Sequence, residues 1–225
     1  MNISDLLNNP HKLEEIFSEA LLKRNKELID LLVFYIKNSK LVFEYARDIV
    51  GGKVSDELEE VIIKSAYHSY LYAKDILRKP WKKGESIISQ DPEYSYYYAR
   101  DVIKGPWEKG EDAIAQDLYY SYLYAKDVLY KPFPKGESAI AQDPRLIYYY
   151  AKDVVRGKVS DELEEIIASY GYYALKYARD ILKSRFIKSE RVIIKNREYL
   201  NQYVDFLRSI NKLDEFYGDY SYIKE

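Results

Sequence analysis

The sequence contains no cysteine among its 225 residues, and its two histidines are His11 and His68. The lack of thiols excludes disulfides, thiolate metal sites, iron–sulfur clusters and cysteine nucleophiles, and it fits a reducing compartment. Two histidines leave little material for a histidine metal site or a catalytic triad. Lys plus Arg number 35 and Asp plus Glu number 37, so the chain as a whole lacks the cation surplus of a nucleic-acid or membrane binder.

Long hydrophobic runs are also missing. The longest apolar run in the N-terminal region, Leu31 to Ile36, is far shorter than the roughly 20 residues that span a bilayer. Met1 to Asp5 have neither the basic nor the apolar region of a signal peptide. We therefore expect no membrane partner and a cytoplasmic location.

Tyrosine is abundant, with 26 residues against 7 phenylalanines. Many of these tyrosines belong to a tetrapeptide, Tyr-Ala-Lys/Arg-Asp, which recurs at intervals of 26 or 27 residues. Its six copies begin at Tyr45, Tyr72, Tyr98, Tyr124, Tyr150 and Tyr177, and a degenerate seventh begins at Tyr203. Nine residues after each of the six tyrosines stands a large or branched apolar residue: Val54, Trp81, Trp107, Phe133, Val159 and Phe186. Two matching columns over six copies identify a tandem repeat.

Each repeat has the pattern of two short helices. In the copy around Tyr98, Asp91 is a helix cap and Pro92 suits the first helical position. Apolar residues then recur at helical spacing until Gly105-Pro106 stops the helix. A second, shorter helix is expected over residues 111–116, and Trp107 anchors the linker between the two. The Lys-Gly-Glu glycines Gly84, Gly110 and Gly136 are interpreted as turn residues.

A repeat of this size cannot bury its apolar face alone, but stacked repeats can. The sequence therefore predicts an all-α fold, an α-solenoid of short helix pairs with about six or seven repeats of 26–27 residues and atypical capping ends. The predicted organisation is one continuous domain with an N-terminal helical cap (1–40), the tandem repeats (41–195) and a C-terminal cap helix and tail (196–225). The aromatic anchors Trp81, Trp107 and Phe133 are expected to be buried between helices.

The string Tyr-Ala-Arg-Asp-Val-Ile-Lys-Gly-Pro-Trp-Glu-Lys-Gly-Glu, from Tyr98 to Glu111, resembles tandem helical repeats of predicted proteins from tailed bacteriophages and other viruses. The resemblance extends over residues 43–190. It departs from the usual pattern where Pro or Lys replaces an Arg, and where Gly-Glu replaces Ala-Glu. It implies the fold and a viral context, in which the location would be the host cytoplasm. It implies no activity.

The leading candidate site is a ladder of tyrosines and cations on the first helix of each repeat. A residue two positions before the motif tyrosine and a cation four positions later share one helical face, which permits cation–π contact. In the four central repeats these pairs are Tyr70 and Lys74, Tyr96 and Arg100, Tyr122 and Lys126, and Tyr148 and Lys152. Interfaces with proteins are enriched in Tyr and Arg. The alternative is that the tyrosines pack against the next repeat, with the cations lying over them.

The aspartate of each motif forms a second ladder: Asp48, Asp75, Asp101, Asp127, Asp153 and Asp180. Paired carboxylates could serve as acid and base or hold a cation, but one carboxylate per repeat beside a cation favours a structural ion pair. Asp91 and Asp143 precede proline and are interpreted as caps, and His68 as a packing residue. We expect no catalytic residue, no metal site and no cofactor.

These patterns predict a non-catalytic recognition protein that binds a protein partner, a host factor in the viral context, through the Tyr/Lys/Arg ladder. A first alternative is a small-ligand or nucleotide-binding protein that sequesters its ligand. A second is nucleic-acid binding, through base stacking and phosphate contacts. It is disfavoured because an aspartate follows each ladder cation, whereas phosphate binding needs surplus cations.

Overall fold

The computed structural model describes residues 6–220, and within them it consists of helices and connecting segments without a strand. The predicted all-α repeat fold is confirmed. The chain divides into two compact units, Met1–Ile114 and Ala115–Glu225, whose boundary falls inside the tandem repeats. The prediction of one continuous domain therefore stays a prediction. Of residues 6–220, no helix combines the length and apolarity needed to cross a membrane.

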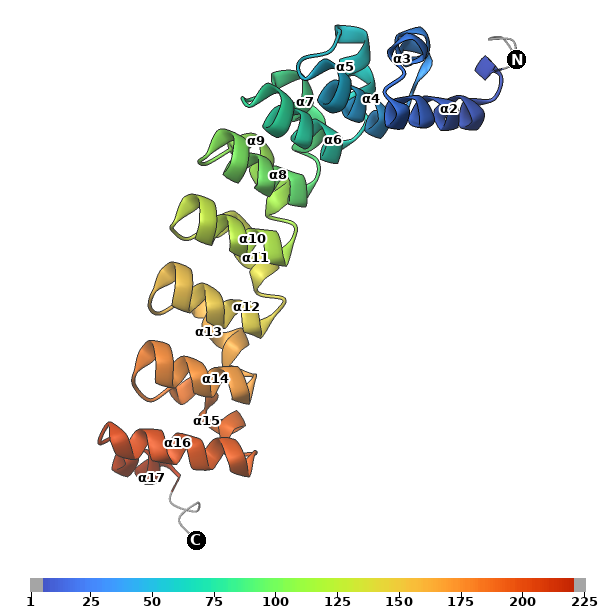
Figure 1. Cartoon of the computed structure of the whole chain (residues 1–225). Coiled ribbons are helices and arrows are strands. Elements are labelled where there is room, and N and C mark those ends of the chain that lie inside the picture. The colour runs from blue at the N-terminus through green and yellow to red at the C-terminus, as the bar shows by residue number, and fades with distance from the viewer. Residues whose placement is uncertain (1–5, 221–225) are drawn as a thin grey trace. The chain divides into compact units, whose positions relative to one another are not determined.

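The first unit begins with cap helices and continues as stacked helix pairs (Figure 1). The cap consists of α2 (Pro10–Lys23), α3 (Lys26–Leu32) and the 3-10 turn η1 (Val33–Tyr35). In each repeat the first helix ends in a π-helical turn and is followed by a second helix. These elements are α4 (Ser39–Tyr45), η2 (Ala46–Val50), α5 (Asp56–Ile62), α6 (Ala66–Leu71), η3 (Tyr72–Leu77), α7 (Lys82–Ile88), α8 (Pro92–Tyr98), η4 (Ala99–Ile103) and α9 (Glu108–Ile114).

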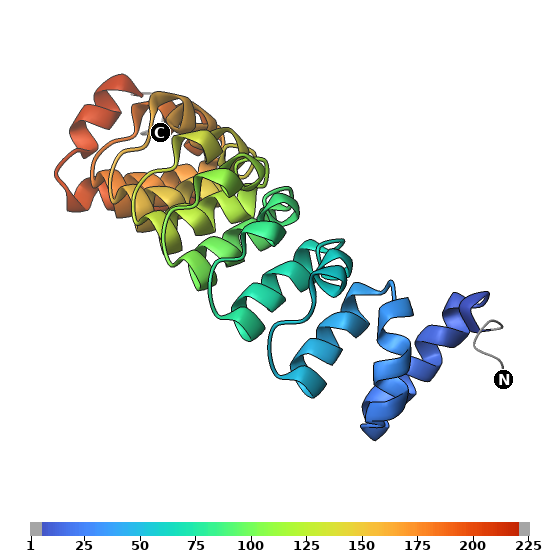
Figure 2. The same ribbon diagram turned by 90° about the horizontal axis from the view of Figure 1, so that it is seen from above.

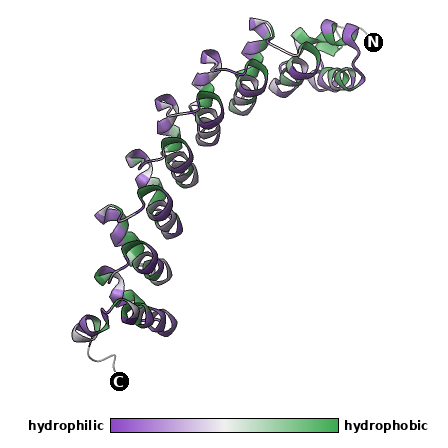
Figure 3. Ribbon diagram, turned by 60° about the vertical axis from the view of Figure 1, so that its left-hand side comes forward, coloured by the Kyte–Doolittle hydropathy of each residue, from purple (hydrophilic) through white to green (hydrophobic). Residues whose placement is uncertain are grey.

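The second unit repeats the pattern, and its first helices lie side by side (Figure 2). Its repeats consist of α10 (Leu118–Tyr124), η5 (Ala125–Leu129), η6 (Pro134–Gly136), α11 (Glu137–Ile140), α12 (Pro144–Tyr149), η7 (Tyr150–Val155), α13 (Asp161–Ala168), α14 (Gly171–Tyr177), η8 (Ala178–Leu182) and α15 (Ile187–Ile193). The C-terminal cap consists of α16 (Arg197–Ser209) and α17 (Leu213–Asp219). Hydrophobic residues gather where the helices of a pair face each other (Figure 3).

The ends of the first helices are set by local chemistry. The predicted start at Asp91-Pro92 is confirmed, because the Asp91 side chain accepts a hydrogen bond from the N–H of Tyr94 at 3.0 Å. The helix ends at Lys104, one residue before the predicted Gly105-Pro106 stop. Lys104 has a left-handed backbone with φ of 60°, and the N–H groups of Lys104 and Gly105 both donate to the carbonyl of Ala99. Equivalent left-handed residues end the other first helices: Gly51, Arg78, Tyr130, Arg156 and Lys183.

The interpretation of the Lys-Gly-Glu glycines as turn residues is wrong for Gly84 and Gly110, whereas Gly136 lies in the 3-10 turn η6. Gly84 and Gly110 lie inside α7 and α9, and α9 begins at Glu108 rather than at the predicted residue 111. These glycines are needed because the aromatic anchor lies against their backbone. A Cβ atom on Gly110 would stand 2.5 Å from the Trp107 ring, and one on Gly136 would stand 2.6 Å from the Phe133 ring. The lack of a side chain therefore serves packing.

The aromatic anchors are buried, as predicted: Trp81, Trp107 and Phe133 are each less than a tenth exposed. Trp81 meets Tyr72 edge to face with ring centroids 4.8 Å apart, and Phe133 meets Tyr124 in the same way at 5.1 Å. The motif alanines are fully buried, which lets neighbouring helices approach closely. The ring of each of these anchors thus packs against the motif tyrosine of its own repeat.

Candidate functional site

Within each unit, motif tyrosines link their repeat to the one before it. The Tyr72 hydroxyl accepts a hydrogen bond from the N–H of Val54 at 3.0 Å and donates to a Glu59 carboxylate oxygen at 3.1 Å. The same two bonds recur for four further motif tyrosines. The hydroxyls of Tyr98, Tyr150, Tyr177 and Tyr203 accept from the N–H groups of Trp81, Phe133, Val159 and Phe186, in that order. They donate to the carboxylates of Glu85, Glu137, Glu164 and Glu190, in the same order. We call this arrangement the tyrosine staple. It satisfies one backbone donor and one carboxylate in the preceding repeat.

The staple carboxylates were missed by the sequence analysis. Glu59, Glu164 and Glu190 are buried, and lysines at the surface cover the first two: Lys83 lies 3.6 Å from Glu59, and Lys188 lies 3.5 Å from Glu164. The available signal was their fixed position 13 residues before a motif tyrosine. Burial raises the pKa of the Tyr98 phenol from its usual 10.0 to about 12, opposed by the N–H of Trp81 and reinforced by Glu85. The staple phenols are therefore held in their neutral form.

The ladder tyrosines are buried, so their rings do not form the exposed binding surface that the leading candidate site requires. Tyr96 is 1% exposed and Tyr122 is 7% exposed, and Tyr70 and Tyr148 are also buried. The reason is a carboxylate supplied by the following repeat. The hydroxyls of Tyr70, Tyr122 and Tyr148 donate to Asp101, Asp153 and Asp180 at 2.6, 2.7 and 2.7 Å. The alternative interpretation, tyrosines packed against the next repeat, is the one that the structure supports.

The ladder cations lie over these rings and remain exposed. Lys74, Arg100, Lys126 and Lys152 stand 5.3, 5.1, 5.4 and 5.9 Å from the ring centroids of Tyr70, Tyr96, Tyr122 and Tyr148. The predicted cation–π pairs are therefore confirmed. Whether the cations bind a partner stays a prediction, whereas the four ladder tyrosines have no exposed ring to offer one.

The aspartate ladder is structural. Asp101 accepts from the Tyr70 hydroxyl and from Arg100 at 2.7 Å, and Lys74 lies 3.7 Å away. Burial alone would raise the pKa of the Asp101 carboxyl, but the bonds from Arg100 and Tyr70 outweigh it and the pKa lies below its usual range. Within residues 6–220, no three carboxylates or histidines lie close enough together to hold a metal ion.

His68 has the packing role predicted for it. Its ring lies 6.0 Å from Phe43 and 5.0 Å from Tyr67, and its Nδ1 atom is 3.0 Å from the Ser39 hydroxyl. Burial lowers the pKa of the His68 imidazole, and Lys40 lowers it further. The ring therefore stays neutral near pH 7.

A different set of side chains forms the exposed surface of the first helices. In the second unit, the exposed residues of α10, α12 and α14, their π-helical turns and the left-handed residue that follows are all Tyr, Lys or Arg. We call this surface the Tyr/cation face. It consists of Tyr119, Lys126, Tyr130, Arg145, Tyr149, Lys152, Arg156, Tyr172, Arg179 and Lys183. In the first unit α6, α8 and their turns expose the counterparts Tyr67, Lys74, Arg78, Arg100 and Lys104, together with Asp75. The first helix α4 and its turn expose Lys40, Arg47, Asp48, Val50 and Gly51.

The exposed tyrosines of this face lie outside the positions that define the repeat motif, so the motif did not single them out. Tyr67, Tyr119 and Tyr172 stand seven residues before a motif cation, and Tyr149 stands three before Lys152. Those spacings place tyrosine and cation on the same side of a helix. A search for all positions on the cation side of the helix would have found them.

The Tyr/cation face is hollowed between α10 and α12. The groove measures about 420 Å³ and is lined by Tyr119, Tyr122, Lys126, Arg145, Leu146, Tyr149 and Asp153. Its floor is the buried pair Tyr122 and Leu146, and its rim carries Tyr119 (53% exposed) and Tyr149 (38% exposed). Asp153 is already engaged by the Tyr122 hydroxyl and by Lys126, which lies 3.6 Å away. The groove offers two aromatic rings and two cationic heads to a ligand.

A second groove in the first unit is more basic. It measures about 300 Å³ and is lined by Ala73, Lys74, Arg78, Lys79, Pro80, Asp101, Val102 and Lys104. Its cations come from the ends of η3 and η4, where the negative end of the helix dipole favours them. Its carboxylate, Asp101, is bound to Tyr70 and Arg100.

Comparisons with protein-family models, with curated proteins and with solved structures find no match to this chain.

Proposed function

We propose that the protein is a non-catalytic recognition protein that binds a protein partner through the Tyr/cation face. The observation that carries this proposal is the composition of that face: over three successive first helices, every exposed side chain is Tyr, Lys or Arg. Tyrosine and arginine are enriched in protein interfaces because they offer a large, rather rigid contact area with a polar tip. The groove between α10 and α12 is the centre of the proposed interface.

The charge of this face defines the partner's surface. The aspartates of the same turns point to tyrosine hydroxyls of the preceding repeat, as Asp153 does to Tyr122. These aspartates are bonded to tyrosine hydroxyls and to neighbouring cations. The Lys and Arg side chains remain exposed at the surface. A partner that carries carboxylates around an apolar or aromatic side chain would complement both the rim cations and the floor of the groove. In the viral context that the repeats suggest, this partner would be a host protein.

Nucleic acid is the second candidate, because the same face combines exposed aromatic rings with cations. The protein partner is favoured because several cations are already partly neutralised. Arg145 lies 2.9 Å from Asp143, Lys126 lies 3.6 Å from Asp153, and Arg179 lies 2.8 Å from Asp180. Binding to a phosphate backbone depends on cations that replace bound counterions.

The test begins with capture of partners from the native host and identification by mass spectrometry, followed by affinity measurement with the purified partner. Tyr119→Ala combined with Tyr149→Ala should weaken binding by about 2 kcal/mol or more, as loss of two aromatic anchors does. The matched control is Tyr170→Ala, which removes an exposed tyrosine outside the groove. It should leave the affinity unchanged.

Two results would count against the proposal. The first is full affinity in the Tyr119→Ala, Tyr149→Ala variant. The second is tight binding to DNA or RNA that falls steeply with added salt while no protein partner binds, which would replace the protein partner with a nucleic acid.

A further inference from the structure

The N-terminal cap exposes an apolar surface that the C-terminal cap lacks. Within the described cap residues, Leu7, Leu22, Leu31, Phe34 and Tyr35 are exposed, Phe34 by 57%. In α16 and α17 no large hydrophobic residue is exposed, and Phe216 and Leu207 are fully buried. The terminal repeats of a solenoid normally present a polar outer surface, because no further repeat covers them. The exposed apolar side chains of the N-terminal cap therefore need an explanation other than closure of the array.

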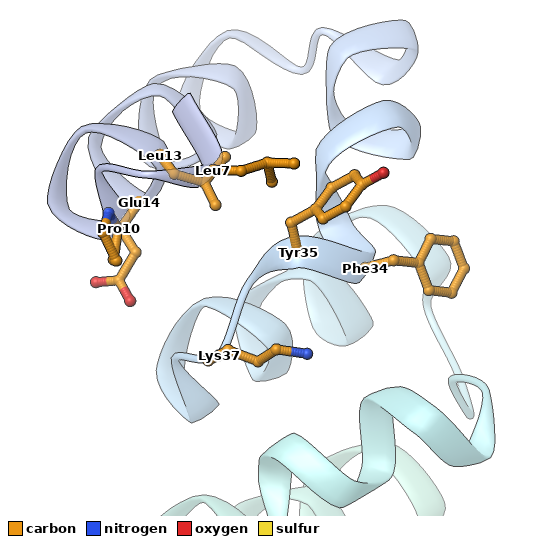
Figure 4. A pocket seen from close by; sticks show the side chains of 7 residues that line it. All are labelled: Leu7, Pro10, Leu13, Glu14, Phe34, Tyr35 and Lys37. Atoms are coloured by element: carbon orange, nitrogen blue, oxygen red, sulfur yellow. The ribbon is translucent and has the colours of Figure 1, made fainter. Parts of the chain in front are cut away.

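Three of these side chains, Leu7, Phe34 and Tyr35, line a pocket of about 290 Å³ between α2 and the segment that follows α3. It is lined by Leu7, Pro10, Leu13, Glu14, Phe34, Tyr35 and Lys37. Figure 4 shows Leu7 and Tyr35 projecting from opposite walls, while the Phe34 ring points away from Leu7 at the rim. The surface thus places a protruding aromatic side chain beside an apolar cavity. A rigid aromatic ring next to a cavity of this kind is a typical anchor of protein interfaces.

The charges at this pocket carry both signs. Glu14 and Lys37 are the charged residues of its lining. The Glu14 carboxylate accepts a hydrogen bond from the Asn38 side-chain amide at 3.1 Å. Because the amide is neutral, this bond does not neutralise the charge of Glu14. A surface with one acid and one base around an apolar centre is complementary to itself after a two-fold rotation. In such an interface the same patch is used on both subunits, so each pairing occurs twice.

We propose that two copies of this chain associate through their N-terminal caps, with a two-fold axis through the pocket. Phe34 of each copy enters the pocket of the other, and Glu14 of each copy pairs with Lys37 of the other. This surface is separate from the Tyr/cation face, so the dimer neither requires nor excludes the proposed partner.

The experiment measures the mass of the purified chain by sedimentation velocity and light scattering over a series of concentrations. The expected mass rises from the 26.7 kDa of one chain to twice that value. Phe34→Asp should raise the dimer dissociation constant more than about tenfold. Leu22→Asp is the matched control, since Leu22 is an exposed apolar residue of α2 outside the pocket. It should leave the dimer intact.

Charge exchange tests the two-fold arrangement itself. Glu14→Lys should dissociate the dimer, because it would place two lysines opposite each other, and the combination Glu14→Lys with Lys37→Glu should restore it. Circular dichroism of each variant separates loss of association from loss of folding. A wild-type chain that stays monomeric at its highest soluble concentration would overturn the proposal. So would a dimer that survives Phe34→Asp, or a folded double variant that stays monomeric.

Discussion

The first helices of the second unit and the second helix α13 present opposite chemistry to solvent. On the first helices of the second unit, the exposed residues are Tyr, Lys and Arg, whereas the exposed residues of the second helix α13 are Asp161, Glu162 and Glu165. In the first unit α5 likewise exposes Asp56, Glu57 and Glu60. A chain with a net charge of −2 therefore combines basic, tyrosine-rich first helices with the acidic helices α5 and α13, whereas the second helix α15 exposes Ile187, Lys188 and Arg191. Net charge averages over the faces on which binding depends.

A similar contrast separates the buried tyrosines from the exposed ones. Staple and ladder tyrosines hold repeats together through hydrogen bonds from their hydroxyls to carboxylates. By contrast, Tyr119 and Tyr149 are exposed. Substitution of the first kind should lower stability, and substitution of the second kind should lower binding. The following predictions test that division, from the largest expected effect to the smallest.

Removal of a buried anchor should have the largest effect. Trp107→Ala should lower the free energy of unfolding by about 3–5 kcal/mol, because it leaves a cavity where the ring packed against Tyr98 and Gly110. Urea denaturation followed by circular dichroism measures this. A loss below roughly 1 kcal/mol would mean that the anchor column is not the core between repeats.

Removal of one staple hydroxyl should have a smaller but specific effect. Tyr150→Phe keeps the ring but deprives the Phe133 N–H and the Glu137 carboxylate of their partner. The expected destabilisation is about 1–3 kcal/mol. The matched control is the adjacent Tyr149→Phe, whose ring is partly exposed, and it should change the stability by less than about 0.5 kcal/mol. Equal effects of the two variants would contradict the division between buried and exposed tyrosines.

High pH should weaken the staples together. The pKa of Tyr98 is raised in the folded chain, from 10.0 to about 12, so the folded state favours the neutral phenol. Stability from this group is fully present below pH 10 and is lost as the pH rises towards 12. Urea midpoints should therefore stay constant up to pH 10 and fall above it. Tyrosinate absorbance should show that the Tyr98 phenol, with its raised pKa, is still neutral just above pH 10; ionisation of every tyrosine by pH 10 would contradict the prediction.

The left-handed position at the end of the first helices should give the smallest change, and one of opposite sign. Lys104 has φ of 60°, a conformation that costs a residue with a side chain about 1–2 kcal/mol. Lys104→Gly should stabilise the chain by about 0.5–1 kcal/mol, since glycine adopts this backbone freely but loses more entropy on folding. A melting temperature that falls would indicate that the Lys104 side chain has a role in folding.

Periodicity made the fold predictable from the sequence, and it also concealed the site. The spacing of the motif tyrosines, the Asp91-Pro92 start and the column of large apolar residues all predicted features that the structure has. Periodicity assigns residues to a helical face but leaves open which face the next repeat covers. The burial of Tyr70 and Tyr122 depended on a hydrogen bond from each hydroxyl to an aspartate 31 residues away, Asp101 and Asp153. Similarly, the left-handed backbone at Arg78, Lys104 and Arg156 carried no glycine to signal it.

The tyrosine staple imposes a direction on the growth of the array. The N–H of an anchor and the carboxylate four or five residues later receive their partner from a tyrosine 17 or 18 residues after the anchor, in the next repeat. During synthesis, every repeat therefore leaves the ribosome incomplete and is completed by its successor. The last link is Tyr203 in α16, which serves Phe186 and Glu190. A chain truncated between repeats would leave the anchor N–H and the glutamate of its last repeat without a tyrosine partner. Deletion of one whole repeat would instead place the next motif tyrosine against an equivalent anchor and glutamate.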